Sequence, residues 1–133
     1  MIEISKDKSR LDINLIHEFL TETYWAKGRT RDEVKISIEH CLCFGVYIDN
    51  KQIGFARIAT DYVVFTYLMD VFILPEYRGK GYSKQLMKVV IEEPLLQSCK
   101  TWMLKTSDAH ELYNQFGYSE LKHPERVMER LLK

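Results

Sequence analysis

The chain has 133 residues, enough for one domain, and 46% of them are hydrophobic, which is enough for a buried core. Its 19 basic and 19 acidic residues give a formal net charge of zero, so the overall charge does not favour binding to nucleic acid or to an anionic membrane. Charged residues interrupt every apolar run before it reaches the length of a membrane span, and the N-terminus lacks the apolar core of a signal peptide.

The three cysteines, Cys41, Cys43 and Cys99, show no spacing typical of a disulfide framework, which suits a reducing compartment. His40 precedes Cys41, but no second Cys/His pair at ligand spacing completes a tetrahedral metal site. We therefore expect one cytoplasmic domain over residues 1–133, with no metal and with neither nucleic acid nor a membrane as its partner.

The N-terminal third of the chain predicts one short strand and two helices. Residues 2–5 alternate apolar and polar side chains, as an edge strand does. Over residues 9–28 the apolar spacing changes to that of an amphipathic helix, with a glycine as its stop. Thr30 and Glu33 form a capping-box pattern, which predicts a second helix through about His40.

Three strands are predicted next. Residues 44–48 and 52–59 are apolar runs joined by the turn sequence Asp49-Asn50-Lys51, and this pattern is typical of a hairpin. After a break at Asp61-Tyr62, residues 63–74 form one long run that we expect to pair with the hairpin.

A helix and a further strand follow. The helix should place Leu86, Val89 and Val90 inward and should end before Pro94. Residues 101–106 are typical of a strand, and a right-handed crossover makes it parallel to the strand that precedes the helix. The order of elements predicts an α+β fold.

The C-terminal region predicts a short helix over residues 109–116, capped by Ser107-Asp108 and stopped by Gly117. Residues 118–121 are expected to form a last strand. The tail, residues 124–133, carries apolar residues at helical spacing, which suits either a docked helix or a contact in a homodimer.

A basic glycine loop lies between the long strand and the helix that follows it. Gly79 and Gly81 permit positive φ and close approach of the backbone, and Arg78, Lys80 and Lys84 add positive charge. Phosphate is often bound in this way, because the first N–H groups of a helix have no internal partner. The P-loop pattern is absent, and Lys84 stands where a dinucleotide fingerprint needs its third glycine. A solvated turn is the alternative interpretation of this loop.

The loop resembles the acetyl-CoA loop of the GNAT superfamily of N-acetyltransferases. That pattern is Arg or Gln, two residues, Gly, one residue, then Gly or Ala, and here Arg78, Gly81 and Ser83 hold the three positions, with Ser83 a small departure. The resemblance implies an α+β fold with a mixed, mostly antiparallel sheet, one parallel strand pair and helices on both faces.

A second stretch, residues 106–118, resembles the other GNAT signature through Ala109, Leu112-Tyr113 and Gly117-Tyr118. By this resemblance Tyr113 is the general acid. Its reference pKa of about 10 keeps the phenol protonated at pH 7, so that it can donate a proton to the departing CoA thiolate. The alternative is a tyrosine that only packs.

The resemblance implies that acetyl-CoA is the cosubstrate and that its acetyl group is transferred directly to an amine in a ternary complex. The positions that it assigns to acetyl-CoA lie in the strand before the loop, in the loop and in the second signature. They are Val71, Phe72, Ile73, Arg78, Gly79, Lys80, Gly81, Tyr82, Ser83, Lys84, Thr106, Ala109 and Tyr113.

The general base is harder to assign. Many GNAT members place a Glu where this chain has Met69, which cannot accept a proton. Asp70 would face the other side of a regular strand, but a bulge would turn it, so Asp70 is the expected base. The alternatives are a structural carboxylate at Asp70, another residue (Glu22, Asp61 or His110), or a water relay.

The acceptor site should lie opposite the CoA arm, beside the turn after the first helix and the middle strands. We expect Tyr24, Trp25, Arg29, Tyr62 and Tyr67 to line it. The sequence does not choose between a small-molecule amine and a protein amine. Two other classes remain open, namely a CoA-binding sensor or partner module without turnover, and a Rossmann-type nucleotide-binding protein.

Overall fold

The computed structural model describes residues 1–132, so the last residue of the predicted tail, Lys133, lies outside the described residues. Five strands form one sheet in the order β1-β2-β3-β4-β5. They are β1 (Glu3–Ser5), β2 (Leu42–Ile48), β3 (Lys51–Thr60), β4 (Phe65–Ile73) and β5 (Thr101–Leu104). Neighbouring strands are antiparallel except β4 and β5, which are parallel. The predicted mixed sheet with one parallel pair is therefore confirmed.

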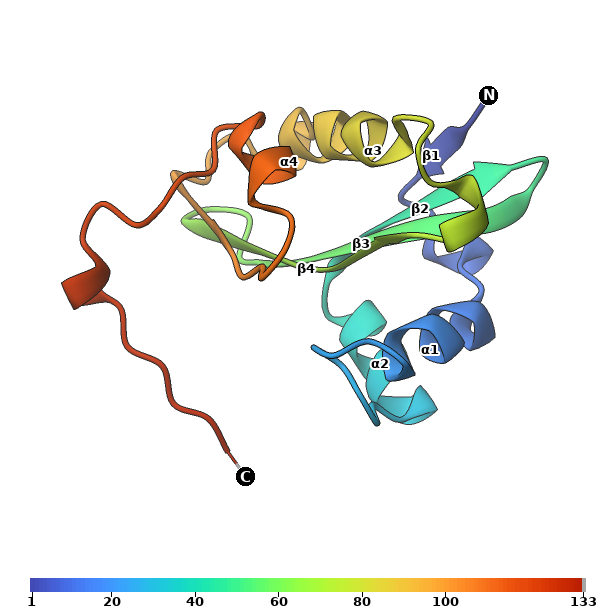
Figure 1. Cartoon of the computed structure of the whole chain (residues 1–133), viewed down its shortest axis with the longest axis horizontal. Helices are drawn as coiled ribbons and strands as arrows, with labels where there is room; N and C mark the ends of the chain where they lie inside the picture. Colours follow the sequence, from blue (N-terminus) through green and yellow to red (C-terminus); the bar gives the residue numbers. More distant parts are fainter. Residues whose placement is uncertain (133) are drawn as a thin grey trace.

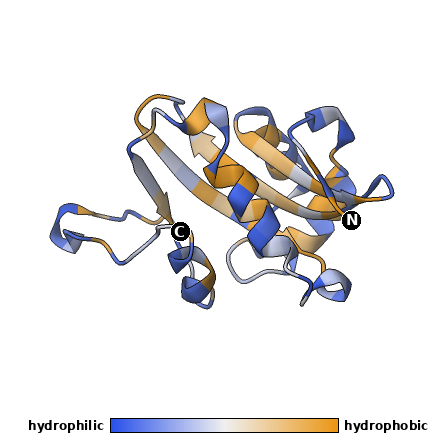
Figure 2. Cartoon of the chain, turned by 90° about the horizontal axis from the view of Figure 1, so that it is seen from above, coloured by the Kyte–Doolittle hydropathy of each residue, from blue (hydrophilic) through white to orange (hydrophobic). Residues whose placement is uncertain are grey.

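Helices cover both faces of the sheet (Figure 1). The helices α1 (Ile13–Thr21) and α2 (Arg31–Glu39) lie on one face, and α3 (Tyr82–Ile91) and α4 (His110–Asn114) lie on the other. Each face has its own buried cluster, one around α1 and α2 and one around α3. Figure 2 shows hydrophobic residues running along the central strands, where burial of apolar area stabilises the fold.

The first helix is shorter than predicted. It begins at Ile13 because Asp12 is its N-cap, with the carboxylate accepting the Leu15 N–H at 3.0 Å. Tight backbone bonds from Glu22 and Thr23 close its last turn, and the chain then leaves the helix well before Gly28. The predicted boundaries at residues 9 and 28 are wrong, although Gly28 does adopt a positive φ of 80° in the loop.

The second helix is confirmed together with its cap. The Thr30 hydroxyl accepts the Glu33 N–H at 3.1 Å, and the Glu33 carboxylate accepts the Thr30 N–H at 2.8 Å. This reciprocal pair satisfies two donors at the start of α2. The β2–β3 hairpin is confirmed as well, with Asp49 and Asn50 both at positive φ in its turn.

Two predictions about α3 and α4 are wrong. The Val89 side chain is 39% exposed, because Leu86, Met87 and Val90 supply the buried face of α3. The cap before α4 is Ala109, and the Thr106 hydroxyl accepts the Ala109 N–H at 3.0 Å in place of a cap from Ser107-Asp108.

Residues 118–121 form no strand, and within the described part of the tail only Pro124–Arg126 makes a helical turn. Figure 1 shows this segment extending away from the sheet, so it is not a docked helix.

Strand β4 contains a bulge that shapes the site. Phe55 pairs with Phe72 and Arg57 pairs with Met69, so Asp70 and Val71 together face one residue of β3. Asp70 takes a φ of 57°, a left-handed conformation that Asp tolerates better than most residues. Pairing between β4 and β5 ends at Leu68 and Leu104, just before the bulge. The two strands therefore separate from this point.

Among residues 1–132, no helix is both long enough and apolar enough to cross a bilayer.

Candidate active site

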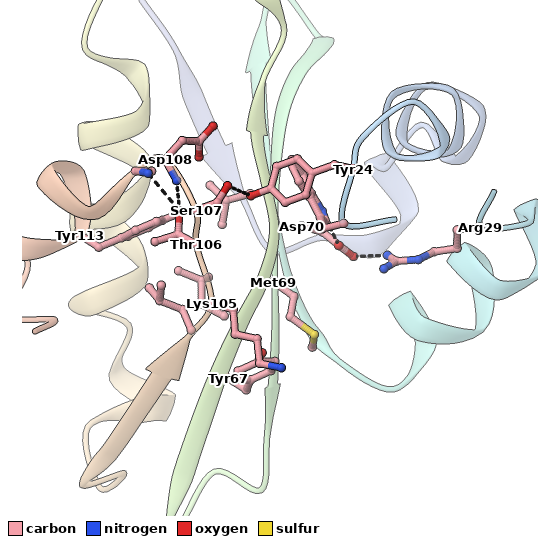
Figure 3. Close-up of a pocket in the computed structure, with 15 residues that line it drawn as sticks. Tyr24, Arg29, Tyr67, Met69, Asp70, Lys105, Thr106, Ser107, Asp108 and Tyr113 are labelled. Carbon is pink, nitrogen blue, oxygen red and sulfur yellow. Dashed lines mark hydrogen bonds and ion pairs between the residues drawn. The ribbon is translucent and has the colours of Figure 1, made fainter. Parts of the chain in front are cut away.

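A cavity of about 490 Å³ opens where β4 and β5 separate (Figure 3). Its walls come from the loop between α1 and α2, from β4, from the end of β5 and from the segment that leads into α4. The lining residues are Tyr24, Trp25, Arg29, Tyr67, Leu68, Met69, Asp70, Val71, Leu104, Lys105, Thr106, Ser107, Asp108, Ala109 and Tyr113.

The cavity gathers residues that sequence reasoning assigned to different roles. Both expected catalytic residues line it, as do four of the five expected acceptor residues. Tyr62 does not, because it lies in the β3–β4 connection, where its carbonyl accepts the Ser98 hydroxyl at 2.8 Å. Phe72, Ile73 and the glycine loop continue beyond the cavity, past the bulge and toward α3.

Sequence reasoning did not assign Lys105, Ser107 or Asp108 to the site. They line it because β5 ends at Leu104 and the chain then turns across the cavity before α4. Ser107 and Asp108 lie within the second signature, residues 106–118, and Lys105 directly precedes it, which is the one signal that could have indicated them.

Tyr113 projects from α4 toward the cavity. Burial raises the pKa of its phenol to about 12, with smaller contributions from Asp108 and Tyr24. The ring packs edge-on against Tyr118 at a centroid distance of 5.9 Å. Among residues 1–132 the Tyr113 hydroxyl has no hydrogen-bond partner, so a protonated donor remains available.

Asp70 lies in a charged cluster under the cavity. Its Oδ2 accepts hydrogen bonds from Arg29 Nη1 at 2.7 Å and from Arg57 Nε at 2.8 Å. Its Oδ1 accepts the indole N–H of Trp25 at 3.2 Å. The Asp70 side chain is only 2% exposed. The bulge thus orients the Asp70 side chain so that it forms an ion cluster with Arg29 and Arg57. This cluster connects β4, β3 and the α1–α2 loop.

All three nitrogens of the Arg57 guanidinium donate hydrogen bonds. Nη1 donates to Cys41 Sγ at 3.3 Å and Nη2 donates to Met69 Sδ at 3.6 Å. Burial alone would lower the pKa of Arg57, but the charge of Asp70 and the hydrogen bonds to Cys41 and Asp70 raise it. Met69, at the position where the resemblance led us to expect a Glu, therefore packs against a guanidinium.

Tyr24 spans the mouth of the cavity. Its hydroxyl is 2.5 Å from the Ser107 hydroxyl, which donates to it, and its ring packs edge-on against Trp25 (Figure 3). This contact joins the α1–α2 loop to the segment before α4. It restricts access to the cavity from that side.

The glycine loop presents free amides at the start of α3. Gly79 and Gly81 both have a φ of 79°, and a Cβ added at either would meet no heavy atom within 4 Å. The first backbone bond of α3 runs from the Gln85 N–H to the Gly81 carbonyl at 3.1 Å. Among residues 1–132, the N–H groups of residues 82–84 consequently have no acceptor. Such an open cradle of amides fits a phosphate group.

Arg78 is not free in this loop, because its Nε donates to the Ile73 carbonyl at 3.0 Å. Within residues 1–132, Lys80 and Lys84 form no ion pair, so their positive charges are the ones available near the free amides. No group of three or more His, Cys, Asp or Glu side chains within residues 1–132 is arranged to hold a metal ion.

The fold and the split between β4 and β5 agree with a match to a family of acetyltransferases. The model of the Acetyltransferase (GNAT) family matches residues 13–118, and the chain belongs to this family. Acetyltransferases with this fold use acetyl-CoA.

Solved structures support the assignment. A crystal structure of a GNAT-family protein from Xanthomonas campestris pv. campestris is 47% identical in sequence, with a TM-score of 0.97 over 99% of this chain and 94% of that one. A predicted acetyltransferase from Clostridium acetobutylicum, solved with acetyl-CoA, is 16% identical with a TM-score of 0.72 over 98% of this chain and 96% of that one, a likeness of fold alone.

Among curated proteins, an acetyltransferase homologue from Gibberella zeae is 28% identical over 84% of this chain and 75% of its own length. The thialysine N-epsilon-acetyltransferase of Sus scrofa is 35% identical over 44% of this chain and 37% of its own length.

Proposed function

We propose that this protein transfers the acetyl group of acetyl-CoA to an amine by direct attack in a ternary complex, with residues 1–133 acting as one domain. The observation that carries this proposal is the position of Tyr113, whose partner-free phenol borders the cavity between β4 and β5. The thialysine acetyltransferase relative supports an amine as the acceptor class. The three cysteines are free thiols, which supports a reducing compartment such as the cytoplasm.

Acetyl-CoA would bind along the edge of β4 and over the glycine loop. The amides of residues 79–84 would hold the diphosphate, because within residues 1–132 none of them donates to a backbone acceptor and they lie at the N-terminus of α3. Val71, Phe72 and Ile73 lie beyond the last β4–β5 pair, so their backbone can pair with the pantetheine arm in place of a strand. Thr106 and Ala109 would border the thioester.

In the reaction, the amine nitrogen attacks the thioester carbonyl carbon, an N–C bond forms and the C–S bond breaks. Tyr113 gives its phenolic proton to the departing thiolate and is reprotonated from solvent. A backbone N–H of β4 would stabilise the charge on the carbonyl oxygen. The amine must lose one proton, and Asp70 was the predicted acceptor of that proton.

The contacts of Asp70 favour a structural role over that of a base. Both of its oxygens already accept hydrogen bonds, and two of the three donors are guanidinium groups. Neither Glu22, Asp61 nor His110 lines the cavity. We therefore propose that water in the cavity takes the proton from the attacking amine.

The acid role of Tyr113 can be tested by the change Tyr113→Phe. General acid catalysis contributes about a hundred- to ten-thousandfold, so kcat should fall by about that factor while acetyl-CoA still binds. Tyr118→Phe is a matched control, because the Tyr118 hydroxyl is buried without a partner. The control should keep its turnover. Undiminished thiol release by Tyr113→Phe would contradict the assignment.

A CoA-binding module without turnover is the second candidate, favoured by Met69 at the position of the family's Glu. Melting temperatures measured with acetyl-CoA, CoA, NAD and ATP separate the candidates, because only a ligand of the native state raises them. Stabilisation by acetyl-CoA without thiol release from any amine would favour the module. Stabilisation by NAD or ATP instead would contradict both.

We also propose that two copies of the chain associate through the tail. Val127, Met128, Leu131 and Leu132 are between 45% and 95% exposed, and β5 has a strand partner on one edge only within residues 1–132. A second copy could pair with the open edge of β5 and cover the exposed apolar side chains of the tail.

A further inference from the structure

The ion cluster beneath the cavity is not electrically balanced. Two guanidinium groups, Arg29 and Arg57, share the single carboxylate of Asp70. The excess positive charge is poorly solvated, because the side chains of Arg57 and Asp70 are 10% and 2% exposed. An uncompensated charge in such surroundings is costly and favours the arrival of an anion.

Arg29 is the member of the cluster that a ligand can reach. It lines the cavity and its side chain is 22% exposed, whereas Arg57 does not line it. Only Nη1 of Arg29 is engaged, and among residues 1–132 its Nε and Nη2 have no acceptor. These remaining donors match the two oxygens of a carboxylate or a phosphate.

In the described part of the chain, other nearby charges form no ion pair with Arg29. The carboxylate of Glu33 is hydrogen-bonded to Thr30, which lowers its pKa, and the charge of Arg29 lowers it further, but the two side chains make no direct ion pair. Lys105 is paired with Glu129 of the tail. Asp108 is near Tyr113, where it contributes to the raised pKa of that phenol. Figure 3 shows Asp108 and Arg29 on opposite sides of β4. The cavity therefore has a negative group near the proposed acid and a positive group at its other end.

We propose that the acceptor is an amine that also carries an oxyanion group, a carboxylate or a phosphate, and that Arg29 binds this group. The inference rests on the proposed acetyl transfer and specifies its substrate class. The acceptor's ammonium end would face the Asp108 and Tyr113 side, and its anionic end would complete the charge balance at Arg29. Polycationic amines would be disfavoured, because they place a second positive charge beside Arg29.

The test compares amines in matched pairs by thiol release from acetyl-CoA. Two pairs differ by a carboxylate, namely lysine with cadaverine and phenylalanine with phenethylamine. One pair differs by a phosphate, namely glucosamine 6-phosphate with glucosamine. We expect kcat/KM to be at least tenfold higher for the anionic member of the preferred pair. Equal rates for both members, or a preference for spermidine, would overturn the inference.

Substitutions of Arg29 test whether this residue causes the preference for the anionic amine. Arg29→Met should reduce the preference for the anionic member at least tenfold, and Arg29→Lys should keep part of it by keeping the charge without the planar fork. Arg31→Met is the matched control, because Arg31 binds Asn14 on the outer side of α2 and does not line the cavity. An equal loss for both members of the pair in Arg29→Met would also overturn the inference, provided that its melting temperature shows a folded protein.

Binding gives a readout that does not depend on turnover. Calorimetry with CoA-saturated protein should show at least tenfold tighter binding of the anionic member of the preferred pair, and Arg29→Met should abolish this difference. Absence of thiol release from every amine would contradict the proposed function alone. Equal or undetectable binding of every anionic and neutral partner would contradict the substrate class.

Discussion

The phenol of Tyr113 holds its proton more firmly in the folded protein than in the unfolded chain, where a tyrosine has a pKa of about 10. Burial raises the folded-state pKa to about 12. Between these two values the unfolded chain has lost the proton and the folded protein has kept it, so the free energy of unfolding falls as pH rises. Below about pH 10 this contribution is fully present.

We therefore expect turnover to show no loss from Tyr113 ionisation up to about pH 11. Burial also raises the pKa of the Cys43 thiol to about 12, so stability should begin to fall above about pH 9. Urea unfolding at pH 7, 9, 10 and 11 should show a steeper fall above pH 10, and Tyr113→Phe should reduce that steeper part. A decline in kcat near pH 9 that disappears in Tyr113→Phe would contradict the raised pKa.

Asp70 combines an unusual backbone conformation with a buried charge, and the change Asp70→Asn separates the two. Asparagine tolerates positive φ but cannot neutralise Arg29 and Arg57. Breaking a buried pair in this way costs about 3–5 kcal/mol, which urea unfolding would measure.

Asp49→Asn is the matched control, because Asp49 also has a positive φ, 49°, and is exposed. It should change stability by less than about 0.5 kcal/mol. Unchanged stability of Asp70→Asn with strongly reduced turnover would instead favour the original prediction of Asp70 as the base.

At the scale of an element, the approach of β3 to β4 depends on Gly54. A Cβ at this position would lie 2.8 Å from the Phe72 carbonyl oxygen, a backbone atom just beyond the bulge. The strands must shift to accept it, and overpacking of this kind costs about 1–3 kcal/mol. We expect Gly54→Ala to lower the urea midpoint accordingly and to weaken acetyl-CoA binding along β4.

Gly45→Ala is an informative comparison, since its closest clash is with the Tyr47 hydroxyl, the end of a side chain. Tyr47 is itself buried, so Gly45→Ala should also lower stability, but its clash does not involve the Phe72 backbone of β4. The Gly45 variant should bind acetyl-CoA as the unchanged protein does. Equal loss of binding in both variants would contradict a specific role for Gly54 beside the bulge.

At the scale of the whole molecule, the proposed association of two copies depends on the tail. Removal of residues 119–133 should convert a dimer into a monomer, because it removes all four exposed apolar side chains of the tail. The double change Leu131→Ser with Leu132→Ser removes two of them and should weaken the association. Light scattering over a range of concentrations measures this directly. A monomeric full-length chain at every concentration would contradict the proposed association.

The sequence by itself determined the parts of this protein whose signals are local. The Thr30 capping box, the Asp49-Asn50 hairpin turn and the positive φ of Gly79 and Gly81 all depend on a few consecutive residues, and the structure has each of them. The order of strands followed from the same kind of signal. The start of α1 was missed although its signal, the Asp12 cap, is also local. The strand predicted at residues 118–121 is absent, because a weak local pattern gave way to tertiary context.

Only the tertiary structure decided the surroundings of Asp70 and the shape of the cavity. Arg29 and Arg57 lie 41 and 13 residues from Asp70 in the chain, and they meet it because a bulge turns one residue of β4. Tyr62 and Tyr67 are the same residue type and lie close together in the sequence. Only Tyr67 lines the cavity, because β4 begins at Phe65 and Tyr62 lies in the connection before it. Such contacts depend on long-range packing, and no short stretch of sequence encodes them.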